Sequence, residues 1–307
     1  MITPQRLQER SRLLQAVRSF FVSRGYAEVD TPIRLPIPLP EAHIKPFLSD
    51  RWYLHSSPEQ CMKRLLAHGC SNNLFQICHC FRKEEIGRYH QTEFTLLEWY
   101  RSGWNYQQLM DECEEFLREL IIAVPDIEGV SSTGFLQRKN SKISLAPSWE
   151  RLTVSGAFEE YAGMSVKEAL EKGMFDEVLV TKIEPHLGWE TPVFLYDYPV
   201  ELGSLARQKK DDLTVAERFE LYIGGIEIAN GFSELIDPDE QRKRFAQEII
   251  KGGELGNEYP GMPEKFLADL ERLGETAGVA LGLDRLFMIL LGCDTVTEVV
   301  CVPEQDL

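Results

Sequence analysis

In several neighbouring segments of this sequence apolar and polar residues alternate as they do in β-strands. Short connections join these segments. Residues 219–230 are the clearest case, because Gly224-Gly225 is typical of a two-residue hairpin turn. Residues 74–84 and 93–101 form a second pair around a polar loop. Strands joined by hairpins pair antiparallel. The sequence therefore predicts an α+β fold built on a mostly antiparallel sheet, with further strands at 193–198, 279–281 and 298–302.

Helical periodicity predicts the elements that flank this sheet. Leu13, Val17 and Phe20 fall on one face of residues 4–24, and Gly25 is a natural helix end. Further helices are expected at 57–67, 106–123, 238–250, 263–273 and 283–291.

The remaining stretches carry weaker signals. Residues 32–46 hold five prolines and are expected to form a loop. Residues 124–148 are expected to form a polar connection, and 149–190 to be mostly helical. No repeat or long linker interrupts the chain. We therefore expect one domain over residues 1–307, with 124–190 as a variable, mostly helical insertion.

Composition limits the class of protein. With 307 residues, 43% of them hydrophobic, the chain can bury a large core, which excludes a disordered chain. Its longest apolar run, residues 286–291, is far shorter than the roughly 20 residues that span a bilayer. Seven cysteines at irregular spacings favour reduced thiols, so we expect a cytoplasmic protein without membrane contact. A net charge of −16 argues against wrapping a long nucleic acid.

The segment 81–100 concentrates polar groups on predicted strands. Because strand side chains alternate between faces, Arg82 and Glu84 should share one face. On the second strand of the pair, Phe94, Glu98 and Tyr100 should also share one face. Glu98 is unusual, since a carboxylate in an apolar strand is costly unless a cation meets it. A structural ion pair, a half-exposed sheet edge and a ligand ammonium all remain open.

The hairpin at 219–230 places two acids close together. In the simplest register Glu220 faces Ala229, and Glu220 and Glu227 become diagonal neighbours roughly 7–8 Å apart. Such a pair suits Mg²⁺ carried by substrate phosphates, and a solvated sheet face is the alternative. Glu234 reaches the same face only if the strand breaks register, and we expect a bulge at Asn230-Gly231.

Residues 278–287 read as a strand, a glycine and a helix start. Arg285 lies in the first helical turn, where the helix dipole disfavours a cation. Either Asp284 or a bound polyphosphate could compensate the positive charge of Arg285. Gly282 would let a flat ligand approach the backbone closely.

Two further groups of residues are more typical of structure than of a site. Glu59 lies in the first turn of a predicted helix, where an acid is favourable without any ligand. Cys70, Cys78, His79 and Cys80 lack the paired spacing of zinc ligands, and His79 falls on the strand face opposite the two cysteines around it. We therefore expect no zinc site from this cysteine pattern.

Together these segments resemble the catalytic domain of class II aminoacyl-tRNA synthetases, in particular the lysine branch. Residues 29–32 are similar to the first class II motif, which implies a homodimer. Residues 81–84 with 93–100 resemble the second motif, and residues 282–285 the third. Residues 227–234 resemble the segment that forms the lysine pocket. The resemblance runs over nearly the whole chain and implies use of ATP and Mg²⁺.

The resemblance implies roles at the nucleotide end of the site. Arg82 and Arg285 would be the catalytic residues, and Arg82 would hold the α-phosphate and the amino-acid carboxylate. Phe94 and Arg285 would sandwich the adenine, and Glu84 would bond to its edge. Glu220 and Glu227 would hold Mg²⁺. The implied ATP-binding residues are Arg82, Lys83, Glu84, Gln91, Phe94, Glu227, Ile228, Gly282 and Arg285.

It also implies roles at the amino-acid end. Glu59 would meet the α-side amine, and Glu98, Tyr100 and Glu234 would surround the ε-ammonium. The implied lysine-binding residues are Ser57, Pro58, Glu59, Glu98, Tyr100, Asn230, Phe232, Glu234 and Ala280.

Within this branch the chain is most similar to stand-alone paralogues that attach lysine to elongation factor P. The chain begins at the helix before the first motif, so we expect no anticodon-binding OB-fold. Ala280 replaces a glycine of the tRNA enzymes, a change that accompanies use of (R)-β-lysine. We expect elongation factor P as protein substrate and no stable tRNA complex. A truncated tRNA enzyme, a ligase making a small lysyl product and a non-catalytic ligand-binding paralogue are the alternatives.

Overall fold

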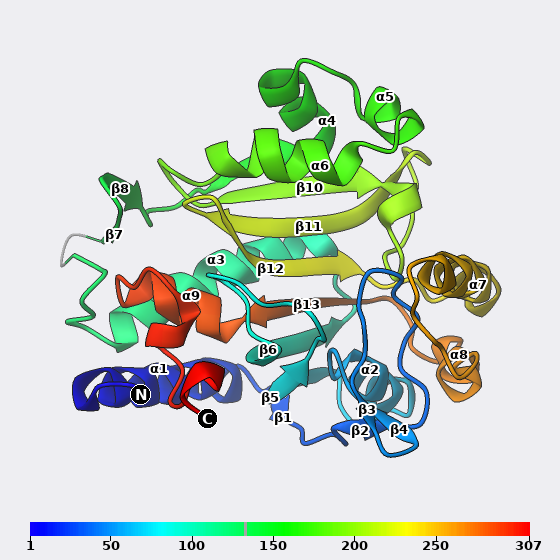
Figure 1. Cartoon of the computed structure of the whole chain (residues 1–307), viewed down its shortest axis with the longest axis horizontal. Helices are drawn as coiled ribbons and strands as arrows, with labels where there is room; N and C mark the ends of the chain where they lie inside the picture. Colours follow the sequence, from blue (N-terminus) through cyan, green and yellow to red (C-terminus); the bar gives the residue numbers. More distant parts are fainter. Residues whose placement is uncertain (132–133) are drawn as a thin grey trace.

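An eight-stranded sheet runs through the centre of the molecule (Figure 1), and the computed structural model describes residues 1–131 and 134–307. The strand order is β1-β5-β6-β13-β12-β11-β10-β9. Only the two outer pairs, β1–β5 and β9–β10, are parallel within this described sheet. The strands are β1 (Ala27–Glu28), β5 (Asn73–Phe81), β6 (Glu93–Ser102), β9 (Glu150–Thr153), β10 (Val193–Pro199), β11 (Val215–Ile223), β12 (Ile226–Ser233) and β13 (Thr276–Gly282). The predicted α+β fold with a mostly antiparallel sheet is confirmed.

Nine α-helices pack around this sheet in the described part of the chain. They are α1 (Pro4–Ser23), α2 (Glu59–Ala67), α3 (Tyr106–Ala123), α4 (Val154–Ala157), α5 (Val166–Glu171), α6 (Phe175–Val178), α7 (Pro238–Glu254), α8 (Glu264–Leu270) and α9 (Leu283–Leu290). Pro58 caps α2 instead of occupying its first turn. None of the helices in the described ranges has the length and apolar character needed to cross a membrane.

One face of the sheet is covered by α1 and α3, which lies behind the sheet in Figure 1. Phe21 of α1 packs against Phe75 and Trp99 of the sheet, with ring centroids 4.9 and 5.1 Å apart. Phe116 of α3 contacts the same cluster at 5.5 Å from Phe21. The opposite face is covered by helices only at its two ends, by α2, α7 and α8 at one and by α4 to α6 at the other. The middle of that face is not covered by these helices and could therefore hold a binding site.

Two sequence predictions outside the main sheet need correction. The strand expected at 298–302 is wrong: a 3₁₀ turn, Val296–Glu298, begins at a capping box of Thr295 and Glu298, and Val299 is buried against the core without a strand partner among the described residues. The polar connection expected at 124–148 contains a hairpin, β7 (Phe135–Arg138) with β8 (Ser141–Ser144), closed by buried Leu136 and Ile143. Residues 132–133 of this segment lie outside the described residues.

A small second sheet carries the loop that leads into α2. Its strands are β2 (Arg34–Leu35), β3 (Leu48–Ser49) and β4 (Trp52–Leu54). The proline-rich loop predicted at 32–46 is thereby confirmed in its main part, with a two-residue strand inside it.

Glu112 of α3 is a buried carboxylate at the contact between α3 and the sheet. It accepts hydrogen bonds from the Tyr26 hydroxyl at 2.7 Å and from Nε1 of Trp99 at 3.0 Å, and it pairs with Arg101 at 2.9 Å. Tyr26 lies in the turn between α1 and β1, and Trp99 and Arg101 belong to β6. One carboxylate therefore fixes α3 against two other elements.

Replacing Glu112 by alanine should lower the free energy of unfolding by about 3 kcal/mol, because Arg101 and two buried donors lose their acceptor. Urea unfolding would measure the change. Glu115→Ala in the same helix removes a half-exposed pair with Arg24 and should cost less than about 1 kcal/mol. Equal losses in the two variants would contradict the role given to Glu112.

Candidate active site

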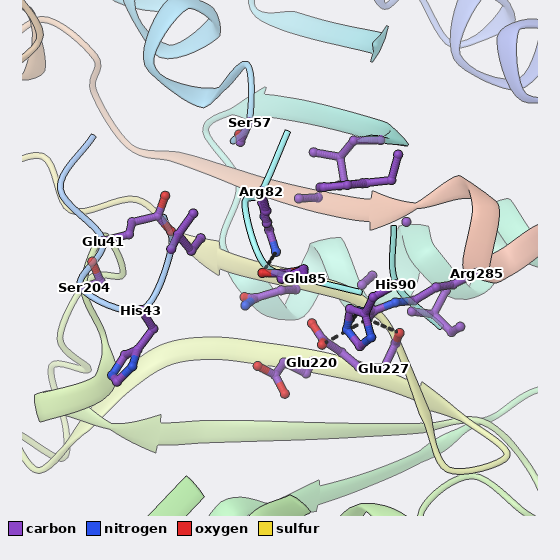
Figure 2. Close-up of a pocket in the computed structure, with 18 of the residues that line it drawn as sticks. Glu41, His43, Ser57, Arg82, Glu85, His90, Ser204, Glu220, Glu227 and Arg285 are labelled. Atoms are coloured by element: carbon purple, nitrogen blue, oxygen red, sulfur yellow. Dashed lines mark hydrogen bonds and ion pairs between the residues drawn. The ribbon is translucent and has the colours of Figure 1, made fainter. Parts of the chain in front are cut away.

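A cavity of about 480 Å³ opens on the sheet face opposite α1 and α3. Figure 2 shows Arg82, Glu220, Glu227 and Arg285 drawn around it. Arg82 comes from the loop between β5 and β6, the two acids from the β11–β12 hairpin, and Arg285 from α9. The three segments that the sequence singled out therefore meet at one cavity.

One cross-strand row runs along the sheet beneath this cavity. Glu98 on β6 lies opposite Ala280 on β13. Ala280 lies opposite Asn230 on β12, and Asn230 lies opposite Glu220 on β11. Side chains directly opposite one another share a sheet face. Two acids, an amide and a methyl group thus line up on four neighbouring strands.

A β-bulge at Ile228 sets the register of the hairpin. Tyr222 faces Glu227 as expected, but the next pair is Leu221 with Ala229, so Ile228 is left over. Glu220 therefore faces Asn230, and the prediction that it faces Ala229 is wrong. The predicted break in register is confirmed, but it lies two residues before the expected position at Asn230-Gly231.

The bulge has a direct effect on the site. Without it, Glu227 and Asn230 would point to opposite faces, because their numbers differ by three. With it, Glu227 shares the cavity face with Asn230 and Phe232, and all three line the cavity.

Glu220 and Glu227 form the acidic side of the cavity. Glu220 is almost wholly buried and accepts hydrogen bonds from the hydroxyls of Tyr198 at 2.5 Å and Tyr222 at 2.7 Å. It also pairs with Arg218 at 2.6 Å. Burial, reinforced by the neighbouring charge of Glu227, raises the pKa of Glu220. An acid whose pKa is raised by a neighbouring carboxylate is a fitting place for a divalent cation.

Arg285 and Asp284 are neighbours at the start of α9, but their side chains contact different parts of the molecule. Arg285 pairs with Glu227 at 3.3 Å and donates to Nε2 of His90 at 2.5 Å (Figure 2). Asp284 instead pairs with Arg10 of α1 at 2.8 Å and accepts from the Thr95 backbone N–H at 2.6 Å. Asp284 therefore does not compensate Arg285, which was one of the two interpretations of the sequence.

Arg82 reaches the cavity, whereas Glu84 does not. β5 ends at Phe81, and Glu84 adopts a φ of 72°, so the prediction that Arg82 and Glu84 share a strand face is wrong. The Glu84 carboxylate lies in solvent, paired with Lys45 at 2.8 Å. Lys83 also lies outside the cavity lining. The contacts of these two residues with a nucleotide stay predictions.

Two nitrogen donors at this end of the cavity are buried without a partner. Nε of Arg82 and Nε2 of Gln91 donate to no hydrogen-bond acceptor among the described residues. The Arg82 guanidinium lies 5.2 Å from the centre of the Phe94 ring and 3.7 Å from Glu85. Buried donors without acceptors are costly. They indicate that an anionic or carbonyl oxygen completes this end of the site.

Glu98 is buried with two hydroxyl groups and no described cation. Its carboxylate accepts from the Ser57 hydroxyl at 2.6 Å and from the Tyr100 hydroxyl at 2.7 Å. It is 1% exposed, so a half-exposed edge is wrong, and it forms no ion pair with any described residue. Burial, with Glu59 nearby, raises its pKa well above the usual value. The ligand ammonium stays as a prediction.

Glu234 has a protein cation as partner. Lys63 of α2 is buried and forms ion pairs with both Glu59 and Glu234. Burial alone would lower the pKa of Lys63, but the two carboxylates outweigh it and raise the pKa, which keeps the ammonium charged. The Lys63 ammonium lies 5.1 Å from the centre of the Phe232 ring. The set expected around one substrate ammonium is thus divided: Glu98 with Tyr100, and Glu234 with Lys63.

Gly278 makes room for the Tyr100 ring. A Cβ at this position would lie 2.2 Å from Cε1 of Tyr100 and 2.9 Å from Oε1 of Glu234. Tyr100 therefore reaches Glu98 only because residue 278 has no side chain.

The other predicted residues divide between the cavity and the layer behind it. Ser57, Glu59, Gln91, Phe94, Ile228, Asn230, Phe232, Ala280 and Gly282 line the cavity, whereas Pro58, Glu98, Tyr100 and Glu234 lie outside its lining. Their contacts with a ligand stay predictions.

Comparisons with known proteins agree with this arrangement. The family model described as tRNA synthetases class II (D, K and N) matches residues 3–306. The chain belongs to this class II tRNA synthetase family. Curated relatives of this class II chain include the elongation factor P–(R)-β-lysine ligases of Proteus mirabilis and Edwardsiella ictaluri. Both are 37% identical, over 97% and 96% of this chain and 94% and 93% of the relatives.

Sequence reasoning missed two charged residues of this class II site. Lys63 forms an i,i+4 pair with Glu59, a pattern that usually marks a solvated helix face. Glu41 lies in the loop between β2 and β3, lines the cavity and accepts a 3.3 Å bond from the Ser56 hydroxyl. Burial raises the pKa of Glu41 to about 7, although Arg82 opposes this. No local pattern in the proline-rich loop pointed to Glu41.

Lys63→Met should lower the free energy of unfolding by about 3–5 kcal/mol, because Glu59 and Glu234 then lose their buried cation. Chemical denaturation would measure this. The matched control is the next residue in the helix: Arg64→Met breaks a more exposed pair with Asp269 and should cost about 1 kcal/mol or less. A Lys63 variant as stable as the Arg64 variant would show that the pair is not the buried unit described.

Proposed function

We propose that this chain is an ATP-dependent ligase that activates (R)-β-lysine or lysine as an aminoacyl-adenylate. It then transfers the aminoacyl group to a lysine side chain of elongation factor P. The names of the relatives support the acceptor, and the class II family supports the adenylate chemistry.

The distribution of charge along the cavity is the observation that carries this proposal. At one end Arg82 and Gln91 present unpartnered donors, and Arg285 adds a second guanidinium. At the other end Lys63 pairs with Glu59 in the lining and with Glu234 behind it. Glu98, also behind the lining, forms no ion pair with any described residue. Three carboxylates and one ammonium leave two acids for a ligand. Either lysine isomer carries two ammonium groups, and ATP supplies the anion.

The residues present fit a magnesium ion. Glu220 and Glu227 offer carboxylate oxygens on the cavity face, where burial and the charge of Glu227 raise the pKa of Glu220. Oxygen ligands from one or two carboxylates plus substrate phosphates are the usual setting of Mg²⁺. When bound, the ion would neutralise charge on the phosphates.

The chain's own residues then have defined tasks in the first step. The amino-acid carboxylate attacks the α-phosphorus in line, and pyrophosphate leaves. Arg82 and Arg285, aimed into the cavity from two sides, stabilise the negative charge that develops. Phe94 lies beneath the Arg82 guanidinium and offers a flat surface for the adenine.

Ala280 supports the choice of the β-isomer. Its methyl group lies between Glu98 and Asn230 in the cross-strand row. A methyl group on this wall fills space near the substrate amine, and one such group discriminates by about 1–3 kcal/mol. We therefore propose (R)-β-lysine as the preferred substrate.

A homodimer through α1 is part of the proposal. Leu7 and Val22 on this helix are 47% and 59% exposed, and Ile33 beyond the first motif is 45% exposed. A second copy would cover these apolar side chains. No stable tRNA complex is proposed.

The transfer step needs a proton acceptor, and we assign Glu41 to it. The acceptor lysine must lose a proton as its amine attacks the adenylate carbonyl and AMP leaves. Glu41 lines the cavity and has a pKa of about 7, which is well matched to accepting a proton at neutral pH.

Purified protein should catalyse ATP–pyrophosphate exchange that depends on (R)-β-lysine and, more weakly, on lysine. Arg82→Met should reduce the exchange rate by about 10²–10³-fold, because a guanidinium is lost where charge develops. Arg88→Met is the matched control, since Arg88 lies on the same loop but pairs with Asp294 in solvent. Absence of exchange with both isomers would refute the proposed activity.

Glu41→Gln should slow transfer to elongation factor P by at least about 10²-fold while leaving pyrophosphate exchange nearly unchanged. The wild-type transfer rate should show an inflection near pH 7, because Glu41 is protonated and inactive below it. The variant should keep only the rise set by the acceptor amine. Single-turnover transfer, followed by intact-protein mass, measures both. A variant with wild-type transfer would exclude Glu41 as proton acceptor.

A further inference from the structure

A second cluster of reactive side chains lies behind the cavity wall. Cys78 and Cys80 project from the same face of β5, and His55 approaches them from the end of β4. The two sulfurs and an imidazole nitrogen all lie within 4.8 Å of one another. Among the described residues this thiol–imidazole cluster is the one group of three such ligands that gathers this closely. The proposed ligase reaction makes no use of it.

The spacing of the cluster matches one face of a metal tetrahedron. The Sγ atoms of Cys78 and Cys80 are 3.8 Å apart. With a Zn–S distance of about 2.3 Å, tetrahedral geometry puts two thiolate sulfurs about 3.8 Å apart. Nε2 of His55 lies 4.0 Å from the Cys80 sulfur. A small shift of the imidazole toward the sulfurs would place the three ligand atoms at three corners of the metal tetrahedron.

His55 is held in place by its backbone. Its N–H donates to the Ile33 carbonyl at 2.9 Å, and its carbonyl accepts from the Phe81 N–H at 3.0 Å. In the ring, Nε2 donates to the His79 carbonyl at 2.8 Å, whereas Nδ1 is buried without a described partner. Nδ1 can therefore take the proton when Nε2 turns to a metal.

A disulfide fits the cluster less well than a metal does. Residues i and i+2 of one strand lie about 6.6 Å apart at Cα. Disulfides prefer about 5.5–6 Å, and 6.8 Å is near their limit. A metal ion bridges the sulfurs at the distance they already have, and β5 keeps its hydrogen bonds to β6.

We propose that His55, Cys78 and Cys80 form a binding site for one Zn²⁺ ion, with water in the fourth position. Binding releases the thiol protons and changes no oxidation state. The ion would join the end of β4 to β5 and so fix the chain that carries Ser57, two residues after His55, toward Glu98. The site is independent of the proposed ligase activity.

Access to the cluster favours this assignment. Cys78 is partly exposed, so an ion can enter from its side, whereas Cys80 and His55 are buried.

The test uses the full-length protein stripped of metal with a chelator and kept reduced. Adding Co²⁺ should produce a thiolate-to-cobalt charge-transfer band that saturates at one equivalent, and Zn²⁺ should abolish it by displacement. Cys78→Ser should remove most of this band and weaken Zn²⁺ binding by more than about 10–100-fold, the loss typical of removing even an outer partner of a metal site.

The strand supplies a matched control. His79 lies between the two cysteines but points to the opposite face, where it pairs with Glu93 at 2.5 Å. His79→Gln should leave the cobalt spectrum and the Zn²⁺ affinity unchanged. Cys78 is the partly exposed ligand, so Cys78→Ser is the ligand variant most compatible with folding, and circular dichroism would confirm its fold.

Three results would overturn the proposal. The first is a wild-type protein that shows no charge-transfer band. The second is a Cys78→Ser variant that binds Zn²⁺ as tightly as wild type. The third is a cluster that, under dilute hydrogen peroxide, forms a Cys78–Cys80 disulfide equally fast with and without added Zn²⁺, because a bound ion would protect both thiolates.

Discussion

The site depends on one irregularity in the sheet, the bulge at Ile228. β-strand side chains alternate strictly, so a regular hairpin could present either Glu227 or Asn230 to the cavity, but not both. The extra residue shifts the alternation by one and brings both to the same face. The cross-strand row from Glu98 to Glu220 then lies beside Glu227 and Arg285. The bulge therefore places the residues proposed for amino-acid binding and those proposed for metal binding on one surface.

Excess negative charge is the second constraint on this surface. Glu98 is buried with two hydroxyl groups, and Lys63 serves both Glu59 and Glu234. Burial raises the pKa of Glu98 and favours its neutral form. The proposed diammonium substrate would reverse that preference. The same side chains would therefore contribute to the recognition of a doubly charged amino acid.

The sequence was sufficient for most strands of the main sheet and for the segments that meet at the cavity, because period-two alternation and the Gly224-Gly225 turn are local signals. It was insufficient for the bulge, since Ile228 is an ordinary strand residue and only pairing with β11 shows that it is unpaired. Lys63 was missed for a related reason. In the sequence its i,i+4 pairing with Glu59 resembles a surface contact, and only the folded chain adds the buried pair with Glu234. The apolar segment 298–302 resembled a strand but is buried by loop packing.

The pair between Arg10 and Asp284 links two parts of the molecule that are usually considered separately. Arg10 belongs to α1, the helix assigned to subunit contact, and Asp284 precedes the nucleotide-facing Arg285 on α9. Asp284 also holds the Thr95 backbone next to Phe94. A displacement of α1 would thus be transmitted to both sides of the adenine position. If the proposed homodimer forms through α1, this one buried pair would couple subunit association to nucleotide affinity, and each copy would respond to the presence of the other.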